Sequence, residues 1–175
     1  MTTSGKENPM DLLATGSTAI LSSATLATVQ AFVAQTRSTA APSTAKTLLV
    51  VGGDAATAQV AATIAGDLKR DLVRVALSTI VSKYIGETEK NLDRVFAAAA
   101  KSDAILLLDE ADALFGKRGD VKDSHDRHAN AAVDGFLRRI ESRAGVAILA
   151  TRAKQDLDGA FLRRLGHVAC VDLPD

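Results

Sequence analysis

Two adjacent carboxylates, Asp109 and Glu110, follow a run of four aliphatic residues at positions 105–108. Such a run is typical of a strand buried on both faces, and the acids then stand where that strand leaves the core. A first carboxylate in this position can hold Mg²⁺, and a second can polarise a water molecule for attack on a phosphate. The pattern predicts half of a nucleotide-hydrolysing site. Acids that merely cap the turn after a strand are the alternative interpretation.

The other half of such a site has its place further upstream. An apolar segment ends at Gly52, where a phosphate-binding loop of pattern G-x-x-x-x-G-K-[ST] would begin. Such a loop needs glycines that let the backbone curl round the phosphate, a lysine and a hydroxyl. The residues at these positions are Gly52, Gly53, Asp54, Ala55, Ala56, Thr57, Ala58 and Gln59. The second glycine, the lysine and the hydroxyl are therefore replaced by threonine, alanine and glutamine.

The missing lysine matters because of the size of the charge effect. With an effective dielectric constant near 20 and a separation of about 5 Å, one pair of unit charges is worth roughly 3 kcal/mol. Micromolar binding of ATP corresponds to about 8 kcal/mol in all, so losing the lysine alone moves the affinity towards millimolar. Asp54 adds a negative charge to the same segment. We therefore expect weak or absent ATP binding.

Segments of alternating type position these residues. Apolar segments predict five strands, at residues 47–52, 72–77, 105–109, 146–150 and 168–171. Between them, helical spacing of apolar residues predicts helices marked by residues 60–68, 92–99, 129–140 and 158–164. This alternation favours an α/β fold, with a parallel sheet covered by helices on both faces. Gly52, Asp109 and Thr151 fall at the carboxyl ends of strands, so one pocket can collect them.

The sequence before this core divides into two parts. Residues 1–21 form a polar N-terminus that we expect to be disordered. Residues 22–45 predict a helix, whose apolar residues share one face after a capping serine, and then a linker that contains Pro42. The core domain spans residues 46–175.

The composition limits the range of functions. Hydrophobic residues make up 47% of the 175 residues and aromatic residues only 3%, which predicts a folded, aliphatic core. Basic and acidic residues are equal at 21 each, so nothing favours a nucleic acid or a membrane surface as the partner. The single cysteine, Cys170, excludes a disulfide within the chain and suits a cytoplasmic protein. We interpret it as a small buried hydrophobe, and a reactive thiol is the alternative.

Several blocks, in this order, resemble the large domain of an AAA+ ATPase of the protein-remodelling clade. Residues 82–89 are similar to the first pore loop and the helix start after it, and residues 107–115 to the Walker B motif. Residues 148–151 and 158–164 resemble the second region of homology. The resemblance runs from about Leu26 to the end of the sequence. It implies a P-loop NTPase-like three-layer sandwich with a five-stranded parallel sheet, with ATP and Mg²⁺ as cofactors.

The resemblance assigns roles to the residues of the pocket. Asp109 would hold the metal, usually through water, and Glu110 would polarise the attacking water. Arg152 stands where the family has a polar sensor, commonly asparagine, on the strand beside Walker B. We therefore expect its guanidinium to reach Asp109 or Glu110 and neutralise these carboxylates. An arginine that points to solvent is the alternative.

Two further sets of residues acquire roles only in a ring of subunits. Arg163 and Arg164 stand where the family carries arginine fingers, whose permanent charge contacts the γ-phosphate bound by a neighbour. Their alternative is a favourable pair of cations at the end of a short helix. Lys83, Tyr84 and Ile85 match the pore-loop residues that grip a threaded polypeptide. Packing at a strand–helix junction is the alternative for the tyrosine.

The remaining features of the sequence point less directly to a chemical function. Residues 116–127 are charged, similar in place to the second pore loop, and we interpret them as a solvated loop. His125 and His128 do not have the spacing of a zinc site, so we treat them as surface residues. The sequence stops at Asp175, where the family continues into a small helical lid, and we expect that lid to be absent here. A short gene and a fragment are both compatible with this ending.

Together these features predict a pseudo-ATPase: an AAA+ core with an intact Walker B and a lost Walker A. Such a protein would be impaired in ATP binding and hydrolysis. It would act as an assembly or interaction subunit with related AAA+ subunits or a protein substrate, in a homo- or hetero-oligomeric ring. The alternative is an active Mg²⁺-dependent AAA+ ATPase that uses an unusual phosphate loop to remodel a protein substrate.

Overall fold

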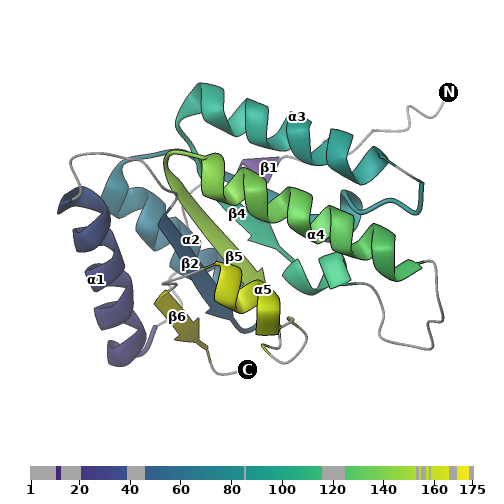
Figure 1. Ribbon diagram of the computed structural model, residues 1–175. Helices are drawn as coiled ribbons and strands as arrows, with labels where there is room; N and C mark the ends of the chain where they lie inside the picture. Colours follow the sequence, from purple (N-terminus) through teal and green to yellow (C-terminus); the bar gives the residue numbers. More distant parts are fainter. Residues whose placement is uncertain are drawn as a thin grey trace, which may run out of the picture.

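The computed structural model describes residues 11–12, 21–38, 46–84, 86–115, 125–152, 154, 157, 159–165 and 169–173, and Figure 1 labels its elements. A twisted sheet forms the middle layer, and helices lie against both of its faces (Figure 1). The three-layer α/β arrangement predicted from the sequence is confirmed. No helix in the described part of the chain combines the length and the apolarity that a membrane crossing requires.

Five parallel strands form the sheet, as the sequence predicts. They are β2 (Lys46–Val51), β3 (Leu72–Ala76), β4 (Ile105–Asp109), β5 (Val146–Thr151) and β6 (Ala169–Asp172). Their order across the sheet is β3-β4-β5-β2-β6, so β5 separates β2 from β4. The register pairs Val51 with Thr151 and Leu108 with Leu149. The carboxyl ends of β2, β4 and β5 therefore meet at one edge.

A short sixth strand extends the sheet beyond β3. This strand, β1 (Asp11–Leu12), pairs antiparallel with β3. It belongs to residues 1–21, for which the sequence predicts disorder. Residues 1–10 and 13–20 of that segment lie outside the described residues, as does the predicted linker at 39–45.

The helices divide between the two faces. Two of them, α1 (Ser23–Ser38) and α2 (Asp54–Leu68), cover one face. The other face carries α3 (Glu87–Ser102), α4 (His125–Ser142) and α5 (Gly159–Arg164). Short 3₁₀ helices, η1 (Leu77–Thr79) and η2 (Ala111–Phe115), follow β3 and β4. The start of α1 has the predicted serine cap, because Ser22 Oγ accepts a hydrogen bond from the Thr25 N–H at 3.1 Å.

The core consists of two apolar layers separated by the sheet. Alternation along β2 sends Leu48 and Val50 towards α1 and α2, and Leu49 towards the opposite layer. The layer under α1 and α2 is aliphatic apart from Phe32. The opposite layer is built round Phe136, which is fully buried and packs against the rings of Phe96 and Phe161. Hydrophobic burial on both faces of the strands holds the carboxyl edge in place.

Candidate functional site

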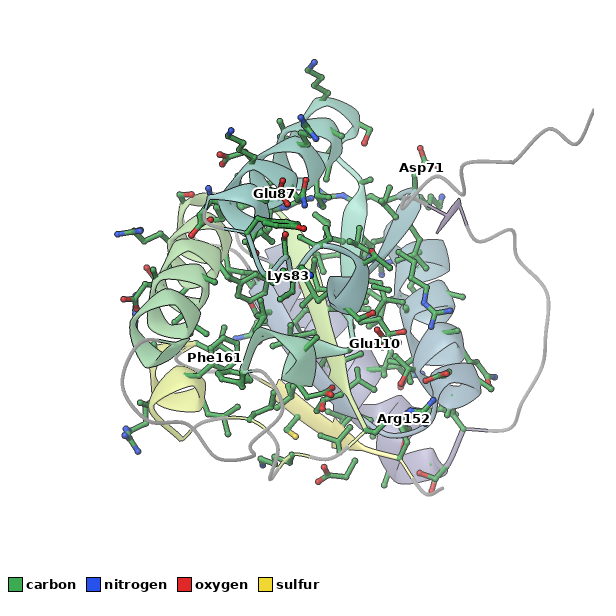
Figure 2. The ribbon with its side chains drawn as sticks, turned by 90° about the vertical axis from the view of Figure 1, so that its right-hand side faces the viewer. Asp71, Lys83, Glu87, Glu110, Arg152 and Phe161 are labelled. Carbon is green, nitrogen blue, oxygen red and sulfur yellow. The ribbon has the colours of Figure 1, made fainter. Side chains whose placement is uncertain are left out.

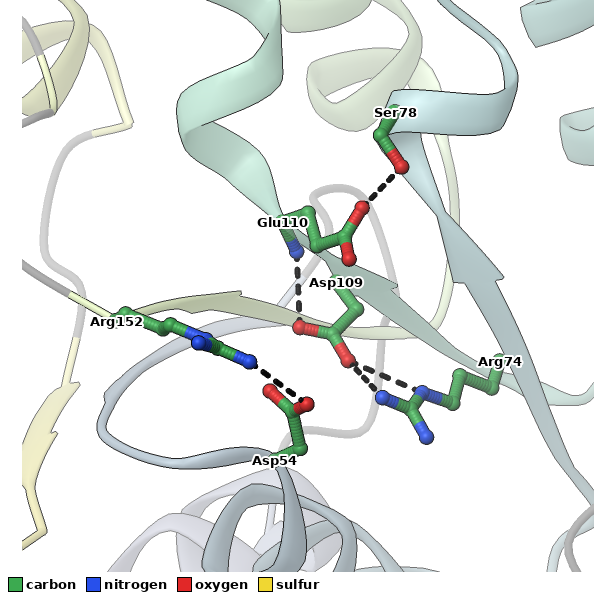
Figure 3. Close-up of polar contacts among 6 residues, drawn as sticks. All are labelled: Asp54, Arg74, Ser78, Asp109, Glu110 and Arg152. Carbon is green, nitrogen blue, oxygen red and sulfur yellow. Dashed lines mark hydrogen bonds and ion pairs between the residues drawn. The ribbon is translucent and has the colours of Figure 1, made fainter. Parts of the chain in front are cut away.

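The carboxyl edge of the sheet holds a small cavity lined mainly by acids. Its volume is about 160 Å³, and its side chains come from α2, η1, β4, the segment after β4, and the end of β5. The titratable residues that line it are Asp54, Asp109, Glu110, Asp112 and Arg152. The sequence predicts one pocket that collects Gly52, Asp109 and Thr151. Of these three, Asp109 lines the cavity, whereas Asp54 and Arg152 line it in place of Gly52 and Thr151. Figure 3 shows how most of these side chains meet.

Asp109 is held by an arginine from the neighbouring strand. The residue is only 5% exposed, and its Oδ1 accepts a hydrogen bond from the Glu110 N–H at 2.8 Å. Its Oδ2 accepts from Arg74 twice, from Nε at 3.0 Å and from Nη2 (Figure 3). Arg74 lies on β3, which pairs with β4 so that Ala76 is opposite Asp109. A buried carboxylate requires such a partner, because an unpaired charge there is costly.

Glu110 projects from a turn with an unusual backbone. Its φ is 57°, in the left-handed region that a side chain other than glycine seldom adopts. The carboxylate accepts a hydrogen bond from the Ser78 hydroxyl of η1 (Figure 3). Its backbone C=O accepts from the Ala113 N–H at 2.9 Å, which anchors the start of η2. The carboxylate itself is exposed at the cavity, as a group that acts on water would be.

The junction between β2 and α2 differs from the predicted loop. Residues 54–59 are helical, so only Gly52 and Gly53 separate the strand from α2. The prediction of a phosphate loop over residues 52–59 is therefore wrong for most of its length. Ala55, Ala56 and Ala58 favour a helix, and no glycine lies between Gly53 and Gly66. A loop wide enough to enclose a phosphate is not formed.

Gly52 is required by packing rather than by a phosphate. A Cβ built on it would lie 2.6 Å from Leu173 Cβ, which is closer than two such atoms approach. Its N–H donates to the Thr151 C=O at 3.0 Å, and the Leu173 N–H donates to the Val51 C=O at 2.7 Å. This glycine therefore lets the chain after β6 pass close to the end of β2.

Asp54 and Arg152 form an ion pair across the mouth of the cavity. Arg152 Nη2 donates to Asp54 Oδ2 at 3.0 Å (Figure 3). The hydrogen bond from Arg152 to Asp54 raises the pKa of the guanidinium, and the charge of Asp54 adds to this effect. Glu110 and Asp109 raise the pKa of Arg152 by smaller, through-space amounts. The expectation that Arg152 contacts Asp109 or Glu110 is corrected: its partner is Asp54, and the cation on Asp109 is Arg74.

The remaining residues of the predicted loop lie along the first turns of α2. Thr57 is 1% exposed, and its hydroxyl has no hydrogen-bond partner in the described part of the chain. Its N–H donates to the Gly53 C=O at 3.0 Å, which is the first helical bond. Ala58 and Gln59 are half-buried in the same helix. None of these residues lines the cavity.

ATP and Mg²⁺, the ligands that the resemblance implies, do not fit these residues. The first turn of α2 carries a carboxylate, Asp54, where a phosphate would need backbone N–H groups and a cation. Both oxygens of Asp109 already accept hydrogen bonds, from Arg74 and from the backbone. The cavity is also smaller than the roughly 300 Å³ at which ligand pockets usually begin.

The two predicted finger arginines have different surroundings. Arg164, at the end of α5, forms ion pairs with Asp134 and, at 3.9 Å, with Glu141 of α4. Arg163 is exposed, and no ion pair is found for it among the described residues. Within the described residues, the ion pairs between these two arginines and α4 therefore all belong to Arg164.

The predicted pore-loop residues lie on the turn before α3. Tyr84 is 62% exposed, which excludes the alternative that it packs at the strand–helix junction. Lys83 Nζ lies 5.4 Å from the centre of the tyrosine ring, within the range of a cation–π contact. Figure 2 labels Lys83 on this turn and Glu87 at the start of α3, and Ser82 Oγ donates to the Glu87 carboxylate at 2.6 Å. Ile85 and residues 116–124 of the proposed second loop lie outside the described residues.

Three residues of the cavity region are not among the site residues predicted from the sequence: Arg74, Ser78 and Asp112. Arg74 had a detectable signal, because it is the one charged residue of an otherwise apolar strand. A charge inside a strand requires a partner, and the acids that end β4 are the nearest candidates. Asp112 accepts a hydrogen bond from Thr151 Oγ1 at 3.3 Å, and Ser78 donates to Glu110. These two contacts depend on turn geometry and have no comparable signal.

Comparisons with known proteins show the family to which the chain is similar. The model of the AAA family, "ATPase family associated with various cellular activities", matches residues 56–173, more than half of the 175 residues. The chain is similar to an uncharacterized AAA family ATPase, y4kL, of Sinorhizobium fredii, with 34% identity over 113 residues, 63% of this chain and 34% of that protein.

Two better-described proteins are also similar. Cell division protein C of Sulfolobus acidocaldarius is 31% identical over 125 residues, 66% of this chain and 33% of that protein. The proteasome-activating nucleotidase of Methanococcus maripaludis is 34% identical over 145 residues, 77% of this chain and 32% of that protein. The chain thus spans about a third of the length of each of these relatives.

Proposed function

Because the chain belongs to the AAA family of ATPases, we propose that it is a degenerate member, impaired in ATP binding and hydrolysis. It acts instead as an assembly or interaction subunit with protein partners. The proposal includes the cytoplasmic location predicted from the cysteine content. Its partners are related AAA subunits or a protein substrate.

The observation that carries the proposal is the Asp54–Arg152 pair at the start of α2. In a working site the start of this helix faces phosphate oxygens, and the favourable end of its dipole stabilises them. Here a carboxylate of the chain itself occupies that end, and the guanidinium from the end of β5 neutralises it. A triphosphate would have to displace this pair and would meet three further carboxylates in the cavity. No lysine of residues 52–59 compensates for that repulsion.

Two exposed features support the partner role. Tyr84, with Lys83 against its ring, presents an aromatic surface at the place of the first pore loop. Arg163 presents a guanidinium without an ion pair in the described part of the chain. In a mixed ring, these groups would contact a polypeptide in the pore and complete the site of a competent neighbour. The similar protein named a proteasome-activating nucleotidase is consistent with a partner that handles polypeptides.

A second candidate function is that of an active Mg²⁺-dependent AAA ATPase. The observation that favours it is the retained acidic pair, because Asp109 is fixed by two neighbours and Glu110 is exposed at the cavity. Hydrolysis would then require Arg74 to leave Asp109 and the Asp54–Arg152 pair to open. In that case the hydrolysis of ATP would require Glu110.

A single-turnover assay with radiolabelled ATP and excess purified chain separates the two functions. The proposal predicts that phosphate release equals the rate without protein, and that Glu110→Gln gives the same trace. Release that exceeds the background and disappears in Glu110→Gln would establish the active ATPase instead. Asp71→Asn is the matched control, since Asp71 is exposed at the opposite edge of the sheet (Figure 2).

A further inference from the structure

A buried arginine lies at the edge of the sheet opposite the candidate nucleotide site. Arg143 follows α4 and precedes β5, so it stands at the amino ends of the strands. Asp71, labelled in Figure 2, belongs to the same edge, because its C=O accepts a hydrogen bond from the first residue of β4 at 2.8 Å. Arg143 is only 8% exposed. Nothing in the proposed function uses this residue.

The guanidinium of Arg143 has donors without acceptors. Nη2 donates to the Ala104 C=O, whereas Nε and Nη1 have no hydrogen-bond partner in the described part of the chain. A guanidinium carries five N–H donors and keeps its charge, so most of its hydrogen-bonding capacity is unused. Desolvation by burial lowers the pKa of Arg143, an effect that the charge of Asp103 partly offsets. Unpaired donors on a buried cation are costly, which indicates that an acceptor belongs here.

The neighbouring charges do not supply that acceptor. Asp103 is well exposed and forms an ion pair with Arg70 at 3.5 Å instead. The other arginine of this region, Arg139, is fully engaged. It donates to Asp93 from Nε at 2.9 Å and also from Nη2, and to the Gly135 C=O from Nη1 at 2.8 Å. Of Arg139 and Arg143, it is therefore Arg143 that has N–H donors without acceptors in the described part of the chain.

A cavity of about 380 Å³ adjoins this arginine. We call it the Arg143 cavity; it opens between the C-terminal ends of α3 and α4, which lie side by side in Figure 1. Its apolar wall is formed by Phe96, Ala99 and Ala100 of α3 and by Ala144. Its polar wall is formed by Asp103, Arg139, Ser142 and Arg143. The volume lies within the range of sites that hold small ligands or a few peptide side chains.

We propose that the Arg143 cavity binds a carboxylate of a polypeptide partner, either a chain end or an acidic side chain. The guanidinium has two edges that each present two parallel N–H donors, one formed by Nε and Nη2 and the other by Nη1 and Nη2. The hydrogen bond to the Ala104 C=O uses one of the two hydrogens on Nη2, so it occupies only one of these edges. One edge with two parallel N–H donors therefore remains, which matches the two oxygens of a carboxylate. The apolar wall accommodates the aliphatic part of the same segment.

A carboxylate fits better than a phosphate. Asp103 lines the same cavity, and its negative charge repels a dianion more strongly than a monoanion. Nε and Nη1 are covered in the free chain, so the acceptor reaches them when the side chain turns towards the cavity that it lines. Among the described residues, the one hydrogen bond found for the guanidinium in its present position is that to the Ala104 C=O.

An NMR titration of the full chain tests the proposal, with the Arg143 Nε–H resonance as the readout. The probes are acetyl-Ala-Ala-Leu with a free carboxylate, its C-terminal amide, and acetyl-Ala-Glu-Leu amide. Saturable shifts with the free acid assign a chain end, shifts with the glutamate peptide assign a side chain, and both support the proposal. The neutral amide should leave the resonance unchanged. Equal shifts with acid and amide, or none with any probe, would overturn it.

Two variants and one competing anion sharpen this test. Arg143→Lys keeps the charge but loses the planar fork, so it should bind the acidic peptide at least tenfold more weakly, as judged by backbone amide shifts at Ala104 and Ser142. Arg138→Lys, at an exposed position of α4, should bind like the unaltered chain. If Arg143→Lys does not fold, the comparison of acid and amide on the unaltered chain still decides. Tighter binding of inorganic phosphate than of either carboxylate would refute the assignment.

Discussion

Arg152 Nη2 lies 3.0 Å from Asp54 Oδ2, which ties the end of β5 to the first residue of α2 beside Asp109 and Glu110 (Figure 3). The two partners are 98 residues apart in the sequence. The pair stands where the AAA family resemblance places phosphate oxygens. The chain therefore supplies, at this place, both an anion and the cation that neutralises it.

Removing the charge of Asp54 should improve the binding of a simple phosphate anion. In Asp54→Asn the start of α2 loses its negative charge, and Arg152 becomes available to an external anion. A charge at a helix terminus contributes up to about 1 kcal/mol, so pyrophosphate should bind roughly fivefold more tightly. Equilibrium dialysis with labelled pyrophosphate measures this effect. Asp71→Asn makes the same change of charge at the opposite edge and should have no effect; equal gains in both variants would contradict the prediction.

The hydrogen bonds between Arg74 and Asp109 predict how substitutions of these two residues change the free energy of unfolding. In Arg74→Met the Asp109 carboxylate stays buried and loses both hydrogen bonds from the guanidinium. We expect the free energy of unfolding in urea to fall by about 2 kcal/mol. The double variant Arg74→Met, Asp109→Asn should recover most of that loss, because the amide carries no charge.

Arg94→Met is the control for the Arg74 variant, since Arg94 is an exposed arginine on α3. Its free energy of unfolding should match that of the unaltered chain. The interpretation of Arg74 would be refuted if Arg74→Met were as stable as this control, or if adding Asp109→Asn brought no recovery.

The aromatic cluster under α3, α4 and α5 should be the most sensitive part of the core. Phe136 is fully buried, and its ring centroid lies 6.2 Å from that of Phe96 and 6.1 Å from that of Phe161. Phe136→Ala should lower the free energy of unfolding by about 3–5 kcal/mol, because a large cavity replaces the ring. Phe115→Ala, at a partly buried position, should cost clearly less in the same urea experiment. A reversed ranking would show that the packing described for Phe136 is not what stabilises this layer.

Tyr84 should matter for binding and not for folding. The side chain is exposed, so Tyr84→Ala should leave the thermal midpoint within error of the unaltered chain. Cross-linking to an unfolded model polypeptide, through a photoreactive group placed at Ser82, should fall in this variant. Val81→Ala, at a less exposed neighbouring position, is the control and should cross-link normally. Unchanged cross-linking in Tyr84→Ala would remove the pore-loop role from the proposal.

The sheet was predictable because its strands are short, aliphatic and separated by helical patterns. Residues 105–109 illustrate this, since four aliphatic residues in succession are typical of a strand buried on both faces. The position of Asp109 at the carboxyl edge followed from the rule for parallel sheets. These properties depend on local composition and on general topology, which a single sequence contains.

The start of α2 was not predicted, because the family pattern was given more weight than the residues present. Ala55, Ala56 and Ala58 favour a helix, and the helix reaches back to Asp54. The partner of Arg152 is not predicted, for a different reason. Which of several acids a long side chain reaches depends on strand order and rotamers, and neither is written in the local sequence.

The affinity of the full chain for ATP, measured by isothermal titration calorimetry with and without Mg²⁺, tests the central claim most directly. The Asp54–Arg152 pair at the carboxyl edge predicts a dissociation constant of about a millimolar or weaker in both conditions, because the lysine is missing and Asp54 occupies the start of α2. Mg²⁺ should bring no improvement, since Arg74 already holds Asp109. A low-micromolar dissociation constant that depends on Mg²⁺ would contradict the account.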